Sequence, residues 1–336
     1  MKKLTIFFIV IDFLVAICFF VVYGPFESFR NTIITTAIST KTHDYIAYTF
    51  YSEEKVREVL DLNSYVPLTD DVDLDAIVID TAPRDTYDNE YDEQILTRDP
   101  NNDTYKYIKV KVGAYDGHLV AIYDPSKVVL MTCKKFNTSN RSGKEKVLSM
   151  TKRYKAVVGI NGGGFSDPDG YGSDIPIGYV IKDGKIIWST SDNKENLIGF
   201  TKDHKLILTN ATGQEALDMG IRDALQFGPF LIVNGESISY KNSAGGYERA
   251  ARAAIAQRKD GIVLFLVTEG THTKGPNLKE VAEVLAKYGA YNAANLDGGT
   301  STQMVIKNKL VNNPKNIFGQ TVSGGRMVVT AWGVVE

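Results

Sequence analysis

Apolar and polar residues alternate in short runs from residue 105 onward, and this pattern predicts a domain rich in β-strands. Ile108, Val110 and Val112 alternate with lysines, which is the period of a half-buried strand. Apolar runs at residues 119–123, 128–132, 156–160, 263–267, 291–296 and 327–335 predict further strands. Polar turns at residues 182–185, 202–205 and 259–261 each stand between apolar runs and predict hairpins.

Two stretches of the same region have helical periodicity instead. Residues 144–154 carry Val147, Met150 and Tyr154 on one face. Residues 278–288 form a clearer helix, since Asn277 can act as its N-cap and Glu280 as the capping-box partner. Because helices and strands do not alternate as βαβ units, the pattern predicts an α+β fold with mixed, mostly antiparallel sheets and a few helices.

The N-terminus carries an apolar run that predicts one transmembrane helix. Lys2 and Lys3 precede residues 4–23, which are almost wholly apolar, interrupted by Asp12, and about long enough to cross a bilayer. The positive-inside rule then places the N-terminus in the cytoplasm and the rest of the chain outside. Residues 1–25 are therefore predicted to be a cytoplasmic tip and an uncleaved, single-pass signal anchor in the cell membrane. A cleaved signal peptide is the alternative, although no A-x-A pattern ends the run.

Residues 26–103 separate this anchor from the strand-rich region. Residues 26–63 have imperfect helical spacing and predict one or two helices of a membrane-proximal stalk. Residues 70–103 contain twelve Asp or Glu residues and two Arg, with few aliphatic residues after Ile79. That composition favours a solvated linker, and an acidic calcium-binding segment is the alternative. Residues 104–336 then form the third segment, the principal domain.

Composition and net charge argue against several classes of binding and metal site. The formal net charge of -2 offers no basic face for nucleic acid. The two cysteines, Cys18 and Cys133, cannot build a disulfide framework or a cysteine zinc site. The four histidines are scattered, so a histidine metal site or a Ser-His-Asp triad has little support. We expect no cofactor and no bound metal.

Two glycine-rich loops follow apolar strands and form the candidate site. The first reads Asn161-Gly162-Gly163 after residues 156–160, and the second reads Asp297-Gly298-Gly299-Thr300 after residues 291–296. Glycine lets the backbone approach a ligand because no Cβ intervenes, and its exposed N–H groups can hold anionic oxygens. We expect the two loops to form two walls of one pocket, although a strand followed by Asp-Gly-Gly can also be only a turn.

Charged residues near these loops suggest acid–base chemistry on a polar substrate. Glu269 and Asp297 each follow an apolar strand and precede glycine. A pair of carboxylates is the usual catalytic arrangement for glycoside cleavage. Arg252 and Arg326 can hold a phosphate with two hydrogen bonds each. Together these groups suit a sugar joined through a phosphate. The alternatives are a solvated Glu269 and a surface ion pair for Arg252.

Two other motifs are incomplete. Asp167, Asp169 and Gly170 have the spacing of part of a calcium loop, but the later ligands and the terminal Glu of an EF-hand are missing. The Asn-Gly-Gly-Gly stretch lacks the G-K-[ST] of a Walker motif.

Several of these stretches, in this order, resemble the phosphodiester glycosidase family, whose bacterial members include exopolysaccharide biosynthesis proteins. The matching stretches are residues 159–165, 227–229, 252–256, 268–270 and 292–299, together with Arg326. Asn-Leu-Asp-Gly-Gly at residues 295–299 is the most specific of them. The chain departs from the family pattern at Ala253 and Ala256, where R-T-A-I-G is common, at Glu269, where Asp is common, and at Thr300, where glycine is frequent.

The resemblance implies hydrolysis of a glycosyl-1-phosphodiester on the sugar side of the phosphate, in cell-surface polysaccharide or cell-wall polymer metabolism. It implies Asp297 as nucleophile or base and Glu269 as second carboxylate, with Arg252 and Arg326 on the phosphate. Asn161, Thr300 and the loop glycines would position the sugar; these glycines are Gly162, Gly163, Gly298 and Gly299. A non-catalytic polysaccharide-binding or assembly protein is the alternative, and a calcium-stabilised adhesion module is a third.

Overall fold

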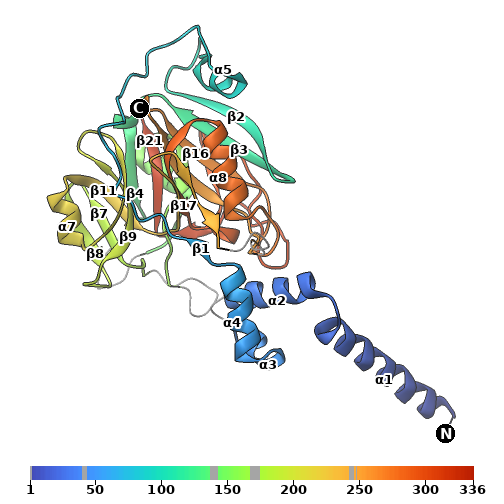
Figure 1. Ribbon diagram of the computed structural model, residues 1–336. Helices are drawn as coiled ribbons and strands as arrows, with labels where there is room; N and C mark the ends of the chain where they lie inside the picture. Colours follow the sequence, from blue (N-terminus) through green and yellow to red (C-terminus); the bar gives the residue numbers. More distant parts are fainter. Residues whose placement is uncertain (1, 40–43, 137–142, 167–174, 242–245, 247) are drawn as a thin grey trace. The chain divides into compact units, whose positions relative to one another are not determined.

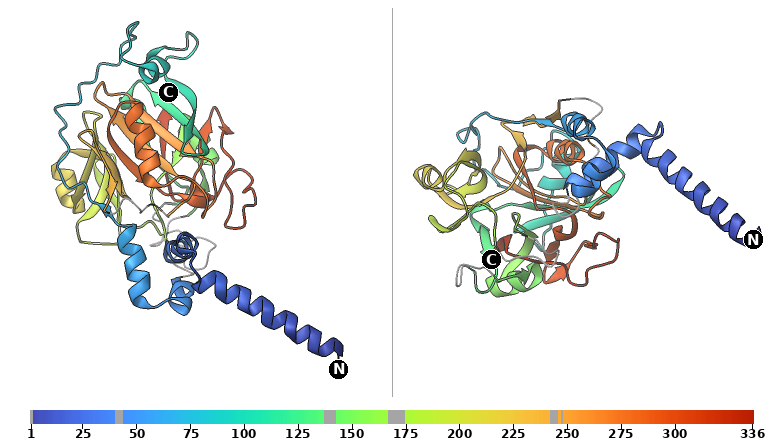
Figure 2. Two further views of the ribbon diagram at one scale, coloured as in Figure 1. Left: turned by 45° about the vertical axis from the view of Figure 1, so that its right-hand side comes forward. Right: turned by 90° about the horizontal axis from the view of Figure 1, so that it is seen from below.

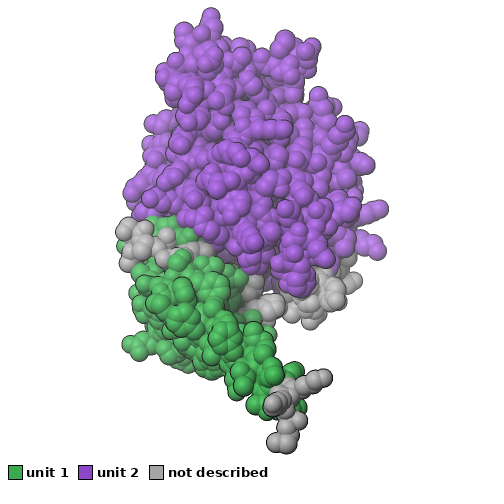
Figure 3. Space-filling view, turned by 90° about the vertical axis from the view of Figure 1, so that its right-hand side faces the viewer, with its two compact units in different colours: residues 1–64, 240–248 green, residues 65–239, 249–336 purple. Residues whose placement is uncertain are grey.

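The computed structural model describes residues 2–39, 44–136, 143–166, 175–241, 246 and 248–336. The chain divides into two compact units, coloured separately in Figure 3. Unit 1 contains residues Met1–Ser64 and Tyr240–Glu248, and unit 2 contains Tyr65–Ser239 and Arg249–Glu336. The sequence had suggested boundaries after residues 25 and 103.

Unit 1 is helical. Its helices are α1 (Lys2–Tyr23), α2 (Glu27–Ser39), α3 (Asp44–Phe50) and α4 (Glu53–Leu62). Within α1, Leu4–Tyr23 has a mean hydropathy of 2.9 and none of it is buried, so it is long and apolar enough to cross a membrane. The stalk region forms three helices rather than one or two, because Ser52 caps a new helix by accepting from the Lys55 amide. Ile34, Ala47, Val56 and Val59 are buried where α2, α3 and α4 meet.

Unit 2 is built mainly from three large antiparallel sheets (Figure 1). The seven-stranded sheet has the order β13-β12-β17-β15-β16-β3-β2, with β2 (Tyr105–Val112), β3 (Tyr115–Ile122), β12 (Phe230–Val233), β13 (Glu236–Ser237), β15 (Ala253–Arg258), β16 (Val263–Thr268) and β17 (Ala290–Leu296). One five-stranded sheet has the order β19-β18-β6-β21-β4, with β4 (Val128–Thr132), β6 (Ala156–Asn161), β18 (Met304–Ile306), β19 (Lys309–Leu310) and β21 (Thr330–Val335). The other has the order β10-β9-β11-β7-β8, with β7 (Tyr179–Lys182), β8 (Lys185–Ser189), β9 (Glu195–Thr201), β10 (Leu206–Ala211) and β11 (Ile221–Gln226).

Shorter elements complete the secondary structure of the residues that the structure describes. They are the strands β1 (Tyr65–Val66), β5 (Glu145–Lys146), β14 (Ser239–Tyr240) and β20 (Met327–Val328), the helices α5 (Glu90–Leu96), α6 (Val147–Tyr154), α7 (Gly213–Asp218) and α8 (Leu278–Lys287), and the 3-10 turns η1 (Pro125–Lys127) and η2 (Gly299–Ser301). The predicted α+β class is confirmed.

A central hydrophobic core draws side chains from all three sheets, and helices cover their outer faces. Ile160, Phe200, Phe265 and Trp332 are fully buried members of the central core. Helix α8 packs on β17 and β12 of the seven-stranded sheet, α6 packs on β6, and α7 packs on β10 and β11 (Figures 1 and 2). Each layer therefore buries one apolar face of a sheet against the centre and the other against a helix.

The local predictions are largely confirmed. The three predicted hairpins join β7 to β8, β9 to β10 and β15 to β16. Helix α8 has the full capping box between Asn277 and Glu280. The last predicted strand is divided: β20 pairs with β5, whereas β21 lies between β4 and β6.

The acidic stretch at residues 70–103 differs from the solvated linker that its composition favoured. Ile77 and Ile95 are completely buried, and the Val78 amide donates to the Lys259 carbonyl at 2.8 Å. Asp92 pairs with the buried Arg258 at 2.8 Å. A few apolar side chains and one buried ion pair thus hold this segment on unit 2, although most of its surface is acidic and exposed.

Candidate functional site

The two glycine loops lie side by side at the ends of β6 and β17. The Asn161 side-chain amide donates to the Asp297 carbonyl at 2.6 Å, and the Asp297 amide donates to the Gly162 carbonyl at 3.0 Å. These bonds join the central strand of a five-stranded sheet to a central strand of the seven-stranded sheet. The two loops are therefore in contact, and the pocket that they were expected to wall stays a prediction.

The Asn161 side chain connects two backbone segments inside the protein. Its side chain is fully buried, and its Oδ1 accepts from the Gln303 amide at 3.0 Å while its Nδ2 holds Asp297. Both ends of the side-chain amide thus bind backbone. The sequence had suggested that Asn161 contacts sugar hydroxyls, and the geometry instead assigns it to positioning the Asp297 loop.

The loop glycines also serve close packing. The Gly162 and Gly163 amides donate to the carbonyl and Oγ1 of Thr330 at 2.9 and 3.2 Å, and the Gly299 amide donates to the Ala251 carbonyl at 2.8 Å. A Cβ at Gly162 would lie 2.6 Å from Thr330 Oγ1, closer than atoms can approach. The expected cradle of free N–H groups is therefore not what Gly162, Gly163 and Gly299 provide, because protein oxygens already satisfy them.

The two arginines approach this junction from different sides. Arg252 directly precedes β15, whose Ala253 stands opposite Val267 on β16 and Leu296 on β17. Arg252 therefore lies between Thr268 and Asp297 along the same edge of the sheet, half-exposed, with its Nε donating to the Pro276 carbonyl at 3.3 Å.

Arg326 reaches the far end of the Asp297 loop. Its Nη1 donates to Ser301 Oγ at 3.2 Å, and its guanidinium lies 4.9 Å from the centre of the Phe165 ring. The Arg326 carbonyl accepts from the Gln303 side chain at 2.9 Å, so the residue that Asn161 holds also holds Arg326. Between these contacts, Gly298 and Thr300 are half-exposed on the loop. Arg249, by contrast, forms an ion pair with Glu280 at 2.9 Å.

Glu269 stands at the same sheet edge, on the other side of β15. Its Oε1 accepts from the Asn313 amide at 3.0 Å and lies 3.2 Å from His118 Nε2. Burial by itself raises the pKa of Glu269, but the hydrogen bonds from His118 and Asn313, together with the nearby positive charges, outweigh it and hold the pKa below its ordinary value. Glu269 is therefore a carboxylate at neutral pH.

This lowered pKa predicts that Glu269 stabilises the fold less in acid. Since the folded-state pKa lies below the ordinary 4.5, its contribution is present above that pH and is lost as the pH falls through the folded-state value. Urea unfolding of the wild type and Glu269→Gln, followed by the fluorescence of Trp188 and Trp332, should show a stability difference that shrinks from about pH 7 to about pH 3. A difference that stays constant over this range contradicts the assignment. Glu283→Gln is the control, since that carboxylate is largely exposed.

Two histidines near the site were not predicted from the sequence. His118 is 8% exposed and contacts Glu269, and its Nδ1 lies 2.7 Å from the Tyr107 hydroxyl. His272 lies against Gly299, where a Cβ would be 2.6 Å from its Nδ1. The four histidines are scattered and no H-x-x-x-H pair joins them, so their spacing in the sequence does not mark His118 or His272 as site residues. The register of the β2–β3 hairpin would have placed Tyr107 and His118 on one face.

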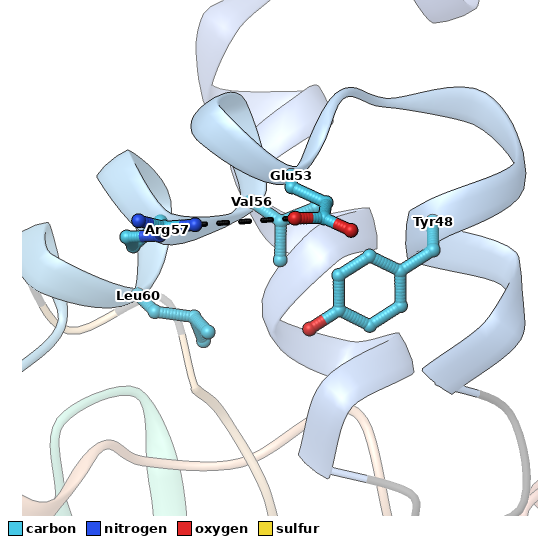
Figure 4. Close-up of a pocket in the computed structure, with 5 residues that line it drawn as sticks. All are labelled: Tyr48, Glu53, Val56, Arg57 and Leu60. Carbon is cyan, nitrogen blue, oxygen red and sulfur yellow. Dashed lines mark ion pairs between the residues drawn. The ribbon is translucent and has the colours of Figure 1, made fainter.

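Other candidate features lie elsewhere. Asp167, Asp169 and Gly170 fall outside the described residues. Among the residues that the structure does describe, no cluster of three or more His, Cys, Asp or Glu side chains is arranged to hold a metal ion. A pocket of about 390 Å³ in unit 1 is lined by Tyr48, Glu53, Val56, Arg57 and Leu60 (Figure 4). None of the predicted site residues belongs to it.

Comparison with known proteins identifies the family. A family model described as phosphodiester glycosidase matches residues 154–335, more than half of the chain. The chain belongs to the phosphodiester glycosidase family. The strands β6, β15 and β17, which lead to the candidate site, all lie within this match.

Relatives of this family member come from bacteria and animals. The chain is 29% identical over 198 residues to the SPbeta prophage-derived uncharacterized protein YomE of Bacillus subtilis (strain 168), covering 57% of this chain and 30% of that protein. It is 25% identical over 225 residues to N-acetylglucosamine-1-phosphodiester alpha-N-acetylglucosaminidase of Mus musculus, covering 60% and 42%. The chain thus spans less than half the length of these relatives.

A solved structure shares the fold. The zebrafish N-acetylglucosamine-1-phosphodiester alpha-N-acetylglucosaminidase catalytic domain, auto-inhibited by its pro-peptide, matches with a TM-score of 0.59 at 21% identity. The match covers 72% of this chain and 87% of that chain. It therefore extends the shared fold beyond the residues that the family model matches.

Proposed function

We propose that unit 2 hydrolyses a glycosyl-1-phosphodiester on the sugar side of the phosphate. The observation that carries this proposal is the hydrogen-bonded junction between Asn161 and Asp297, which are 136 residues apart in the sequence. Around that junction the fold brings together Arg252, Ser301 and Arg326. A loop that carries a carboxylate and has an arginine near each end suits a sugar that is joined to an anionic phosphate.

In this proposal the arginines do much of the catalytic work. The leaving group is a phosphate monoester, which already departs easily, so strong help from a general acid matters less. Arg252 and Arg326 would stabilise the charge that develops on the phosphate as the bond to the anomeric carbon breaks. Arg326 contacts Ser301 in the Asp297 loop, and Arg252 directly precedes the strand that pairs with the strand leading into that loop, so we assign both arginines to the phosphate.

The carboxylates would act on the sugar. Asp297 is half-exposed, and its backbone amide and carbonyl are held by Gly162 and Asn161. We assign its carboxylate the role of nucleophile or base at the anomeric carbon. Glu269, ionised because its pKa is lowered, would be the second carboxylate and would not serve as the proton donor.

The position of the cleaved bond provides the test. The wild-type full chain, in detergent, is incubated with an N-acetylglucosamine-1-phosphodiester in water enriched in oxygen-18. Attack at the anomeric carbon leaves the phosphate monoester product unlabelled, and this is the expected result. Label in the phosphate monoester contradicts the proposal, because it means attack at phosphorus. Binding of the sugar phosphate without release of sugar favours the non-catalytic polysaccharide-binding or assembly protein.

We further propose that α1 anchors this glycosidase in the cell membrane, with a cytoplasmic N-terminus and an extracytoplasmic unit 2. Support comes from Leu4–Tyr23 and from the lysines that precede it. Tyr23, Tyr45 and Tyr48 are each at least 51% exposed within unit 1, and tyrosine favours the membrane interface. A site on the outer side of the membrane suits glycosyl-phosphate links of cell-surface polysaccharide or cell-wall polymers. Alkaline extraction of membranes checks the anchor, and full release of the chain contradicts it.

A further inference from the structure

The β2–β3 hairpin carries two polar side chains to the candidate second carboxylate. Tyr107 on β2 and His118 on β3 are diagonal neighbours, because Tyr107 stands opposite Val120 and His118 opposite Lys109. The Tyr107 hydroxyl lies 2.7 Å from His118 Nδ1, and His118 Nε2 lies 3.2 Å from Glu269 Oε1. The two rings stack with centres 6.0 Å apart and planes 10° apart. Both residues precede the residues 154–335 that the family model matches.

When the His118 ring is neutral, the chemistry of the three groups allows one direction for these hydrogen bonds. An ionised Glu269 can only accept, so His118 must carry its proton on Nε2. Nδ1 of a neutral ring is then an acceptor, and the Tyr107 hydroxyl donates to it. Burial and the nearby charge of Glu269 raise the pKa of Tyr107, which keeps this hydroxyl protonated. Each donor in this Tyr107–His118–Glu269 series therefore has an acceptor.

We propose that Tyr107 and His118 are positioning residues that hold Glu269 as an oriented carboxylate in the catalytic site. This inference rests on the function proposed above, because it gives Glu269 a role in the reaction. His118 sets the direction of the Glu269 carboxylate together with the Asn313 amide at 3.0 Å, and Tyr107 selects the ring tautomer that can donate. The hairpin is thus part of the catalytic apparatus, supplied by the region before the family match.

The arrangement predicts a specific pH effect. Without the hydrogen bond from His118, the pKa of Glu269 rises, so the acidic limb of the kcat/KM profile moves to higher pH. The other titratable groups around this pair come from several elements and must be allowed for: Lys109 and Lys111 on β2, Asp116 on β3, and Lys315 after β19. None of these is altered in the variants below.

Three variants separate positioning from packing. His118→Phe removes the donor and should lower kcat about tenfold to a hundredfold, with KM little changed. His118→Gln keeps a donor near the Nε2 position and should recover most of that loss. Tyr107→Phe removes one hydroxyl and should cost about threefold to tenfold. Tyr115→Phe, half-exposed on the same hairpin, is the matched control and should match the wild type.

A nitrogen-15 NMR measurement of the histidine rings makes the test independent of turnover. In the full chain at about pH 8, where ordinary histidine is neutral, the wild type should show His118 as the Nε2–H tautomer. Tyr107→Phe and Glu269→Gln should each shift that tautomer balance, and His118→Gln identifies the resonance. If the wild type releases no sugar, the proposed function fails and the tautomer alone decides the inference. An Nδ1–H ring, a ring unaffected by both variants, or wild-type kcat with an unmoved acidic limb in His118→Phe overturns it.

Discussion

Replacing Asp297 with asparagine is expected to lower kcat for release of sugar from a glycosyl-1-phosphodiester by about 10²–10⁴-fold. The amide cannot act as nucleophile or base at the anomeric carbon. The change should leave the fold intact, because the hydrogen bonds that hold this residue to Gly162 and Asn161 use its backbone amide and carbonyl. The measurement is steady-state kinetics on the full chain, with urea unfolding monitored in parallel.

Asp203→Asn is the matched control for this prediction. Asp203 is an exposed carboxylate in the turn between β9 and β10, so its replacement should leave both turnover and stability unchanged. If Asp297→Asn retains turnover within about a factor of two, the carboxylate has no part in the rate-limiting chemistry. If instead both turnover and stability fall, the loss reports a structural role.

Replacing Arg258 with methionine is expected to destabilise unit 2 by about 3–5 kcal/mol. The Arg258 side chain is 8% exposed and pairs with Asp92 at 2.8 Å and Asp260 at 3.0 Å, both of which are also largely buried. It also donates to the Tyr288 carbonyl at 2.9 Å, at the end of α8. Methionine fills a similar volume but leaves two buried carboxylates without their cation, which costs more than the lost attraction alone.

Arg84→Met provides the comparison. Arg84 pairs with Asp80 at 3.4 Å, and the two side chains are 40% and 63% exposed, so solvent screens the pair and its loss should cost about 0–1 kcal/mol. Both tryptophans of the chain, Trp188 and Trp332, belong to unit 2, so the change in their fluorescence during urea unfolding reports on the unit that contains Arg258. Equal losses in the two variants would mean that burial does not distinguish the pairs.

Local features of the fold were readable from the sequence. The period of two in β2, the polar turns of the three hairpins and the capping box of α8 all depend on residues within about ten positions of one another. The division of the last strand was harder to predict, because the break at Val329 depends on different partners for β20 and β21. The acidic stretch was harder still, since the ion pair between Asp92 and Arg258 joins residues 166 positions apart.

The candidate site was readable in part. The sequence placed Asn161 and Asp297 together through the pattern of strands that end in glycine loops. It could not reveal that the Asn161 side chain is buried and held at both ends, because its partners, Asp297 and Gln303, come from distant loops. Nor could it connect His118 with Glu269, since no local pattern relates a hairpin strand to the end of another strand 151 residues later.

The sequence by itself therefore determined the strands, turns and helix ends, and it marked the residue types that can carry this chemistry. Only the tertiary structure decided which side chains remain available to a substrate and which are buried and hydrogen-bonded within the protein. The physical reason is that a buried amide, carboxylate or imidazole must find hydrogen-bond partners, and in this protein those partners are supplied by strand ends that are adjacent in space and far apart in the chain.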